Sequence, residues 1–325
     1  MQRPDLDEGA ELPLFTLFIP TYNRAPLLPR ALASIEAQTF RDFEVVIVDD
    51  GSTDQTRELI ADWRARVDFP VSYHWQPNQG KYAAHNLGVE LARGRFFVLL
   101  DSDDRLLPKA LERLLFHWET IPAGERQRFA GVEGLIESLD GQRLLTQPYP
   151  ESPLDIGFLD LNYRRGIGGD KKRAILTDIL RHFPYPVFPG EKNLRDSLTW
   201  NRMALKYVFR CVNESFQQVE YQADGLTSNR FAIRMGSPQG FRLCCLEEVT
   251  LFRPWLSRRQ LRRSMIDYIR YSLHSRVDFR AQASQVQSSP LWLVLWPAGW
   301  LRWLGDRYRL RFRGGRQPNK VKFRN

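Results

Sequence analysis

Short apolar runs alternate with segments of helical periodicity over the first 120 residues of the chain. The apolar runs, which predict strands, lie at 15–19, 43–48, 71–75 and 96–100. Apolar residues recur at the spacing of amphipathic helices at 27–38, 53–67, 81–93 and 108–119. Strands that alternate with helices in this way are typical of βα units, so we predict an α/β fold with a mainly parallel, Rossmann-like sheet flanked by helices.

The pattern is less regular beyond residue 120. We predict a strand at 129–139 and helices at 171–182 and 196–208, whereas the apolar segment 154–163 fits neither period. The domain organisation that we predict has a flexible N-terminus, one large domain in two halves, and a basic, helical C-terminal segment. Their bounds are 1–12, 13–253 (halves 13–120 and 121–253) and 254–325.

Charge divides the chain at the same place. Residues 254–325 hold 16 Lys and Arg against 3 Asp and Glu, whereas residues 1–253 hold 31 against 35. The pI of about 9.6 for the whole chain would suggest a nucleic-acid-binding protein. An acidic body with a basic tail argues instead against nucleic acid as the partner.

The basic segment also holds four tryptophans, Trp292, Trp296, Trp300 and Trp303, with arginines around them. Its apolar stretch is too short to span a bilayer, and Pro297 is expected to break it. Tryptophan beside arginine is typical of segments that lie on anionic lipid, so we expect 254–325 to contact a membrane surface. The alternative is a helix packed on the body.

Few cysteines and the lack of a visible secretory leader favour a reducing compartment. Cys211, Cys244 and Cys245 suggest neither a disulfide framework nor a zinc site. We therefore expect a cytoplasmic protein at the inner face of the plasma membrane.

Polar residues follow three of the four predicted strands, at 20–23, 49–52 and 101–104. Ligands of open α/β sheets bind beyond the carboxyl ends of the strands, so these segments should line one site. Asp101, Asp103 and Asp104 offer hard oxygen ligands, which suit Mg²⁺ or Mn²⁺ together with substrate phosphates. The alternative is a solvated acidic turn that caps the next helix.

Two further segments favour a nucleotide. Asp50 stands at a strand tip, where a carboxylate can accept a hydrogen bond from a base or a ribose. Lys81 begins a helix, where a cation is electrostatically unfavourable unless an anion lies nearby.

Four segments occur in the order and spacing of family 2 glycosyltransferases, and as a set they resemble that family over residues 13–120. They are the segments at 18–24 (Phe-Ile-Pro-Thr-Tyr-Asn-Arg), 45–54, 80–88 and 100–104 (Leu-Asp-Ser-Asp-Asp). The resemblance implies the GT-A fold and a nucleoside diphosphate sugar donor, with UDP the expected nucleotide.

The resemblance also implies roles for individual residues. Pro20, Thr21, Tyr22 and Asn23 would bind the donor, with Thr21 and Tyr22 at the nucleobase, and Asp50 would bind the base. Lys81 would approach the base or phosphates. The Asp-X-Asp motif would be Asp101-Ser102-Asp103. Asp103 and Asp104 would contact ribose and metal, with Asp101 a further possible ligand, because the sequence holds one aspartate more than the motif.

The catalytic base is expected in the second half, where 190–202 resembles a block of one bacterial subgroup. Asp196 occupies the acidic position of that block, and Glu191 is the alternative. Asp196 could instead only cap the helix that follows it. Asp170 and Trp200 are expected on the acceptor side.

The activity implied is inverting, metal-dependent transfer of a sugar to a hydroxyl of a glycan or lipid-linked acceptor, as in the synthesis of bacterial surface polysaccharide. Two alternatives stay open: a nucleotidyltransferase-like enzyme, although no Gly-rich phosphate loop follows the first strand, and a non-catalytic nucleotide-sugar-binding scaffold.

Overall fold

The structure, a computed structural model, describes residues 12–220 and 230–313. Nearly all of the N-terminus predicted to be flexible, and the last 12 residues of the basic segment, lie outside these ranges. The chain divides into two compact units between Arg230 and Phe231. This division falls earlier than the boundary after Arg253 that composition predicts, because the helix at 238–249 packs with the helices that follow it.

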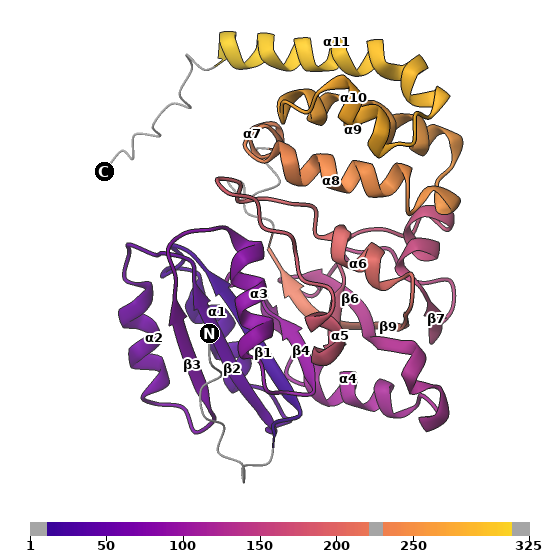
Figure 1. Cartoon of the computed structure of the whole chain (residues 1–325). Coiled ribbons are helices and arrows are strands. Elements are labelled where there is room, and N and C mark those ends of the chain that lie inside the picture. Colours follow the sequence, from indigo (N-terminus) through magenta and orange to yellow (C-terminus); the bar gives the residue numbers. More distant parts are fainter. Residues whose placement is uncertain (1–11, 221–229, 314–325) are drawn as a thin grey trace. The chain divides into compact units, whose positions relative to one another are not determined.

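The first unit is built on a nine-stranded sheet with the order β3-β2-β1-β4-β8-β6-β9-β5, and β7 pairs with β9 (Figure 1). The first four strands run parallel, which confirms the predicted α/β class. The strands are β1 (Phe15–Thr21), β2 (Phe43–Asp49), β3 (Val71–Trp75), β4 (Phe96–Leu99), β5 (Arg105–Leu106), β6 (Phe129–Ser138), β7 (Leu154–Ile156), β8 (Lys172–Leu176) and β9 (Val208–Val219).

Helices cover both faces of this sheet. They are α1 (Leu28–Glu36), α2 (Thr56–Arg64), α3 (Lys81–Leu91), α4 (Ala110–Glu119), α5 (Thr177–Arg181) and α6 (Ser197–Met203), with short turns η1 (Ala123–Arg128) and η2 (Asp160–Arg164). Alternate residues of β1 enter different cores: Leu17 packs with α1, α2 and α4, whereas Phe18 packs with α3 and α6. A strand buried on both faces must be apolar throughout, which explains its continuous apolar run.

Two predicted helices in the second half are wrong in part. Segment 171–182 begins as strand β8 and only then turns into α5, and segment 196–208 holds the short α6 followed by the unpredicted β9. Pairing of β8 between β4 and β6 overrides the helical spacing of its apolar residues.

The second unit is helical. Its elements are α7 (Arg230–Met235), α8 (Pro238–Val249), η3 (Arg253–Trp255), α9 (Arg258–His274), α10 (Phe279–Gln285) and α11 (Pro290–Arg313). Phe241, Cys245, Tyr268 and Trp292 share its core. The break expected at Pro297 is wrong, since α11 runs through this proline, whose ring lies on an exposed side of the helix. Among the described residues, none of the helices combines the length and apolar character needed to cross a membrane.

Candidate active site

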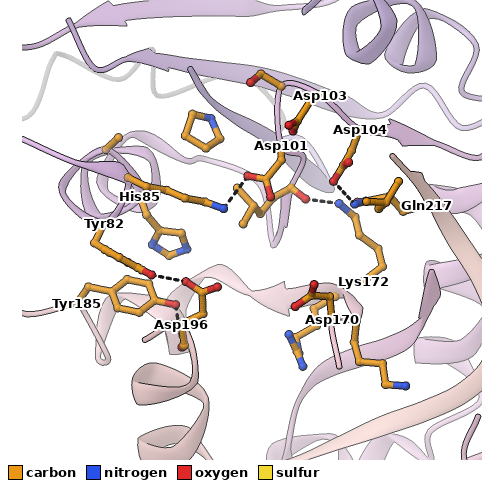
Figure 2. Close-up of a pocket in the computed structure, with 18 of the residues that line it drawn as sticks. Tyr82, His85, Asp101, Asp103, Asp104, Asp170, Lys172, Tyr185, Asp196 and Gln217 are labelled. Atoms are coloured by element: carbon orange, nitrogen blue, oxygen red, sulfur yellow. Dashed lines mark hydrogen bonds and ion pairs between the residues drawn. The ribbon is translucent and has the colours of Figure 1, made fainter. Parts of the chain in front are cut away.

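A cavity of about 790 Å³ opens in the first unit at the carboxyl ends of β1, β2 and β4 (Figure 2). Its size is typical of pockets that hold small molecules. Residues from each of the three predicted strand-end segments line it. The predicted donor and metal residues that line it are Pro20, Thr21, Tyr22, Asp50, Lys81, Asp101, Ser102, Asp103 and Asp104.

Asn23 does not line the cavity. It adopts a left-handed backbone conformation with φ of 52°, its backbone N–H donates to Ser52 Oγ (2.8 Å), and its side-chain oxygen accepts from the N–H of Thr53 (2.8 Å). The side chain therefore joins the loops after β1 and β2 and supports the residues that do line the cavity.

Asp50 is buried and is held by three internal donors. Its carboxylate accepts hydrogen bonds from Gln76 Nε2 (2.7 Å) and from the backbone N–H groups of Gln79 (2.9 Å) and Gly80 (2.7 Å). These bonds fix the loop that leads into α3. Asp50 thus positions Lys81, in addition to any contact that it makes with a ligand.

The acidic segment after β4 is compensated by two lysines. Lys81 Nζ forms an ion pair with Asp101 Oδ1 at 2.8 Å, and Asp104 Oδ2 accepts from Gln217 Nε2 at 2.6 Å. Lys172, on β8, donates to the backbone oxygen of Leu99 beneath the same segment. The lysine at the start of α3 therefore has the anionic neighbour that its position requires.

Burial and crowding of charge shift the ionisation of this cluster. Burial, with the neighbouring carboxylates of Asp101 and Asp103, raises the pKa of Asp104 to about 8. Burial disfavours the charged form of Asp101 as well, but the Lys81 ammonium, together with Lys172 and Arg24, outweighs it and holds the pKa of Asp101 below its ordinary value. Burial lowers the pKa of Lys172 to about 8. The cluster is thus short of positive charge around Asp104.

This donor set fits a divalent cation of the Mg²⁺ or Mn²⁺ type. Its oxygens are hard ligands, and the raised pKa of Asp104 marks negative charge that a cation would offset. Within the part of the chain that the structure describes, no three His, Cys, Asp or Glu side chains converge as a complete ligand set. Such ions are commonly held by one or two carboxylates together with substrate phosphates.

Asp196 faces the cavity from the start of α6, opposite the acidic cluster (Figure 2). It occupies the N-cap position, but its side chain makes no capping hydrogen bond, so the purely structural alternative does not describe it. Its Oδ1 instead accepts from the hydroxyl of Tyr82 at 2.6 Å, and its backbone oxygen accepts from the Tyr185 hydroxyl at 3.2 Å. Glu191 is not among the residues that line the cavity.

Asp170 and Trp200 also line the cavity. Burial raises the pKa of Asp170, and the carboxylate of Asp196 adds to the shift. The ring of Trp200 lies against the Arg173 guanidinium, with 4.8 Å between the guanidinium carbon and the ring centroid, and Arg173 is paired with buried Glu133. An aromatic ring with a fixed cation beside it is a suitable surface for a polar acceptor.

Sequence reasoning missed several lining residues: Tyr82, Lys172, Arg173, Tyr185 and Gln217. Tyr82 follows Lys81 directly in a segment that was already singled out, so its position was a usable signal. Lys172, Arg173 and Gln217 lie on β8 and β9, which the periodicity did not predict as strands.

A mixed sheet that begins with four parallel strands, with an acidic segment after β4 and a second carboxylate across the cavity, is an arrangement of the GT-A type. Residues 16–154 match the family described as glycosyl transferase family 2. This segment therefore belongs to that family, which confirms the resemblance drawn from the motifs.

Two curated relatives are also named as glycosyltransferases. An uncharacterised glycosyltransferase of Nostoc sp. is 39% identical over 125 residues, which cover 38% of this chain and 36% of the relative. The GalNAc(5)-diNAcBac-PP-undecaprenol beta-1,3-glucosyltransferase of Campylobacter jejuni is 36% identical over 106 residues, 32% of this chain and 34% of the relative. The matched segments span about a third of the length of these proteins.

Solved structures show the same fold. TarS 1–349 of S. aureus in complex with UDP-GlcNAc superposes with a TM-score of 0.57 at 19% identity, over 90% of this chain and 81% of that chain. The mannosyltransferase PcManGT of Pyrobaculum calidifontis, in complex with GDP-Man and Mn²⁺, gives a TM-score of 0.53 at 17% identity, over 93% and 88%.

Proposed function

We propose that the chain transfers a sugar, with inversion, from a nucleoside diphosphate sugar to a hydroxyl group of a glycan or lipid-linked acceptor. The observation that carries the proposal is that an acidic segment and a separate carboxylate line the same cavity. The acidic segment 101–104 lies at one wall, and the Asp196 carboxylate lies across from it. A donor diphosphate and an acceptor hydroxyl need these two environments at once.

We propose the following roles for individual residues. Thr21 and Tyr22 would contact the nucleobase and Asp50 would bind the base, and all three line the cavity. Lys81 lies beside the acidic segment and would approach the phosphate oxygens. Asp196 accepts the proton of the acceptor hydroxyl. The hydroxyl oxygen forms a bond to the anomeric carbon as the bond from that carbon to the diphosphate breaks, and the electron pair leaves with the diphosphate.

A divalent cation held by Asp103 and Asp104, with Asp101 available, would supply positive charge to the departing diphosphate. The two solved neighbours support a nucleoside diphosphate sugar as donor, because one binds UDP-GlcNAc and the other GDP-Man with Mn²⁺. We infer a UDP-sugar as the donor of this chain. UDP is the nucleotide that the family resemblance implies.

A polyprenol-linked or other lipid-linked glycan is the acceptor class that we infer. The Campylobacter jejuni relative is named for a glucosyl transfer to an undecaprenol diphosphate glycan, and the second unit carries the basic segment that favours a membrane surface. Asp170 and Trp200 would face this acceptor. The step would belong to the synthesis of a bacterial surface polysaccharide, with the protein at the cytoplasmic side of the membrane.

Replacement of Asp196 by Asn tests the proposal. Sugar transfer should fall by about two to four orders of magnitude, as for the loss of a general base, while the donor still binds. Glu191→Asn is the matched control and should keep transfer near the wild-type rate. Transfer that survives in Asp196→Asn and is lost in Glu191→Asn would assign the base to Glu191. A wild-type protein that binds donor without turnover would favour a scaffold.

A further inference from the structure

The outward side of α11 carries a continuous apolar stripe that no other described element of the second unit covers. Leu301 is 61% exposed and Val294 is 74% exposed, on a helix whose other side is packed. Each residue turns an α-helix by about 100°, so positions spaced by three and four share a side. The stripe consists of Leu293, Val294, Pro297, Trp300, Leu301, Leu304 and Tyr308.

The opposite side of α11 is fixed within the second unit. Trp292 is buried in the core, and Trp296 packs on Phe279 with 5.6 Å between ring centroids. A Cβ on Gly299 would lie 2.5 Å from Ile269, so the glycine allows α11 to approach α9 closely. Asp306 accepts from Arg270 Nε (2.5 Å) and from His274 Nε2 (3.0 Å). These contacts leave α11 one orientation, with the stripe turned outward.

This arrangement divides the four tryptophans of the basic segment between the core and the stripe. Trp292 and Trp296 serve the core, and Trp303 lies beside His274, with 6.5 Å between ring centroids. Trp300 is the tryptophan that lies in the stripe. Arg270, paired with Asp306, is likewise part of the fold and not of a binding surface.

Arginines border the stripe on both sides. Arg307 follows one edge and Arg309 follows the other, by the same 100° geometry, and both are exposed. Arg302 is paired with Asp267 of α9 at 2.9 Å and is part of the fold. An apolar stripe with Trp and Tyr inside it and arginines along its edges matches a bilayer surface, where acyl chains meet anionic headgroups. A protein partner would have to supply acidic groups along both edges.

We propose that the outward side of α11 lies in the surface of an anionic lipid bilayer, parallel to it. From Leu293 to Tyr308 the stripe is about 22 Å long at 1.5 Å per residue. The apolar side chains enter the acyl boundary and the bordering arginines meet lipid phosphates. This proposal does not depend on sugar transfer, because it rests on the second unit alone.

Flotation of the full chain with lipid vesicles tests the proposal. The wild type should float with vesicles of phosphatidylcholine and phosphatidylglycerol, less with phosphatidylcholine alone, and less at high salt. The double variant Leu301→Glu/Leu304→Glu should bind the anionic vesicles at least about tenfold more weakly, because it places two charges in the apolar stripe. Arg307→Gln should reduce mainly the salt-sensitive part of binding.

Leu251→Glu is the matched control, because Leu251 is also exposed (54%) in the second unit but lies outside α11. It should bind vesicles like the wild type. Unchanged thermal unfolding of the double variant shows that the fold is intact. Two results would overturn the proposal: a double variant that floats like the wild type, or a wild type that binds neither vesicle type. A double variant that only abolishes self-association would assign the stripe to a second copy of the chain.

Discussion

The hydroxyl of Tyr82 donates a hydrogen bond to Oδ1 of Asp196 at 2.6 Å, across 114 residues of sequence (Figure 2). The same hydroxyl also contacts the backbone oxygen of Leu194, so its single proton is shared between two acceptors. Tyr82 belongs to the first turn of α3, directly after Lys81, so one helix start contacts both the acidic segment and the proposed base. The bond occupies one carboxylate oxygen and fixes the direction of the other.

Replacement of Tyr82 by Phe should lower kcat for sugar transfer by about tenfold and leave the KM for the donor nearly unchanged. A hydrogen bond to a carboxylate contributes about 1.5–3 kcal/mol, and about 1.4 kcal/mol corresponds to a tenfold change in rate. Steady-state kinetics with the donor varied measures both constants. Tyr73→Phe removes a comparable bond, 2.7 Å to Asp49 outside the cavity, and should keep kcat. Equal losses in both variants would assign Tyr82 a structural role.

Replacement of Asp50 by Asn should weaken both the fold and donor binding. An amide cannot accept from Gln76, Gln79 and Gly80 as a carboxylate does, so the loop before Lys81 loses charge-assisted bonds. Thermal unfolding and nucleotide titration by calorimetry should both show the loss. Asp68→Asn, at an exposed ion pair with Arg41, should change neither. A variant with normal stability and weakened nucleotide binding would mean that Asp50 acts on the ligand alone.

Gly80→Ala should impair activity through the backbone. Gly80 has φ of +96°, and a Cβ there would lie 2.3 Å from the backbone oxygen of Lys192. The conformation alone costs a residue with a side chain about 1–3 kcal/mol, and the contact displaces the loop that leads to Asp196. Activity and thermal stability should both fall, whereas Gly124→Ala, where nothing lies within 4 Å, should be neutral. A fully active Gly80→Ala enzyme would show that this close approach is not required.

Acid should weaken the attachment of α11 to α9 that Asp306 provides. Burial opposes ionisation of Asp306, but hydrogen bonds from His274 and Arg270 outweigh it and lower its pKa below the ordinary 3.8. A lowered pKa in the folded state stabilises the fold above the ordinary value, and this stabilisation is lost as the pH falls through the folded value. The difference in unfolding free energy between wild type and Asp306→Asn should therefore be largest near neutral pH and shrink below about pH 3.8. Denaturant unfolding at several pH values measures it, and a difference that grows in acid would contradict the assignment.

The sequence predicts the fold of residues 13–120 far better than that of the rest of the first unit. Strands such as β2 are buried along their whole length, and the apolar run that this requires is visible without a structure. In β8 and β9, by contrast, Lys172, Arg210 and Gln217 are buried through partners distant in sequence, such as Asp155 and Asp104. Because these buried positions hold polar residues, the sequence does not show the apolar run that would predict a strand.

The same reason limits prediction of the site. Asp101 and Asp104 were predictable, because the carboxyl ends of parallel strands meet at one edge of the sheet. The contact of Tyr82 with Asp196 joins elements from two halves of the unit, and no spacing in the sequence encodes it. Helix α11 is apolar both on the side that packs in the core and on the exposed side. In the sequence these residues form one continuous apolar run, so the tryptophans of the core could not be distinguished from Trp300.

The most direct test of sugar transfer is hydrolysis of UDP-, GDP- and dTDP-sugars by the wild type and by Asp103→Ala, with Mn²⁺, with Mg²⁺ and with EDTA. Slow release of the nucleotide from one donor, lost with EDTA and in Asp103→Ala, is the result that we predict. It would also name the donor. No hydrolysis of any donor, together with nucleotide binding that does not respond to metal, would contradict the assignment of the cavity as a nucleotide-sugar site.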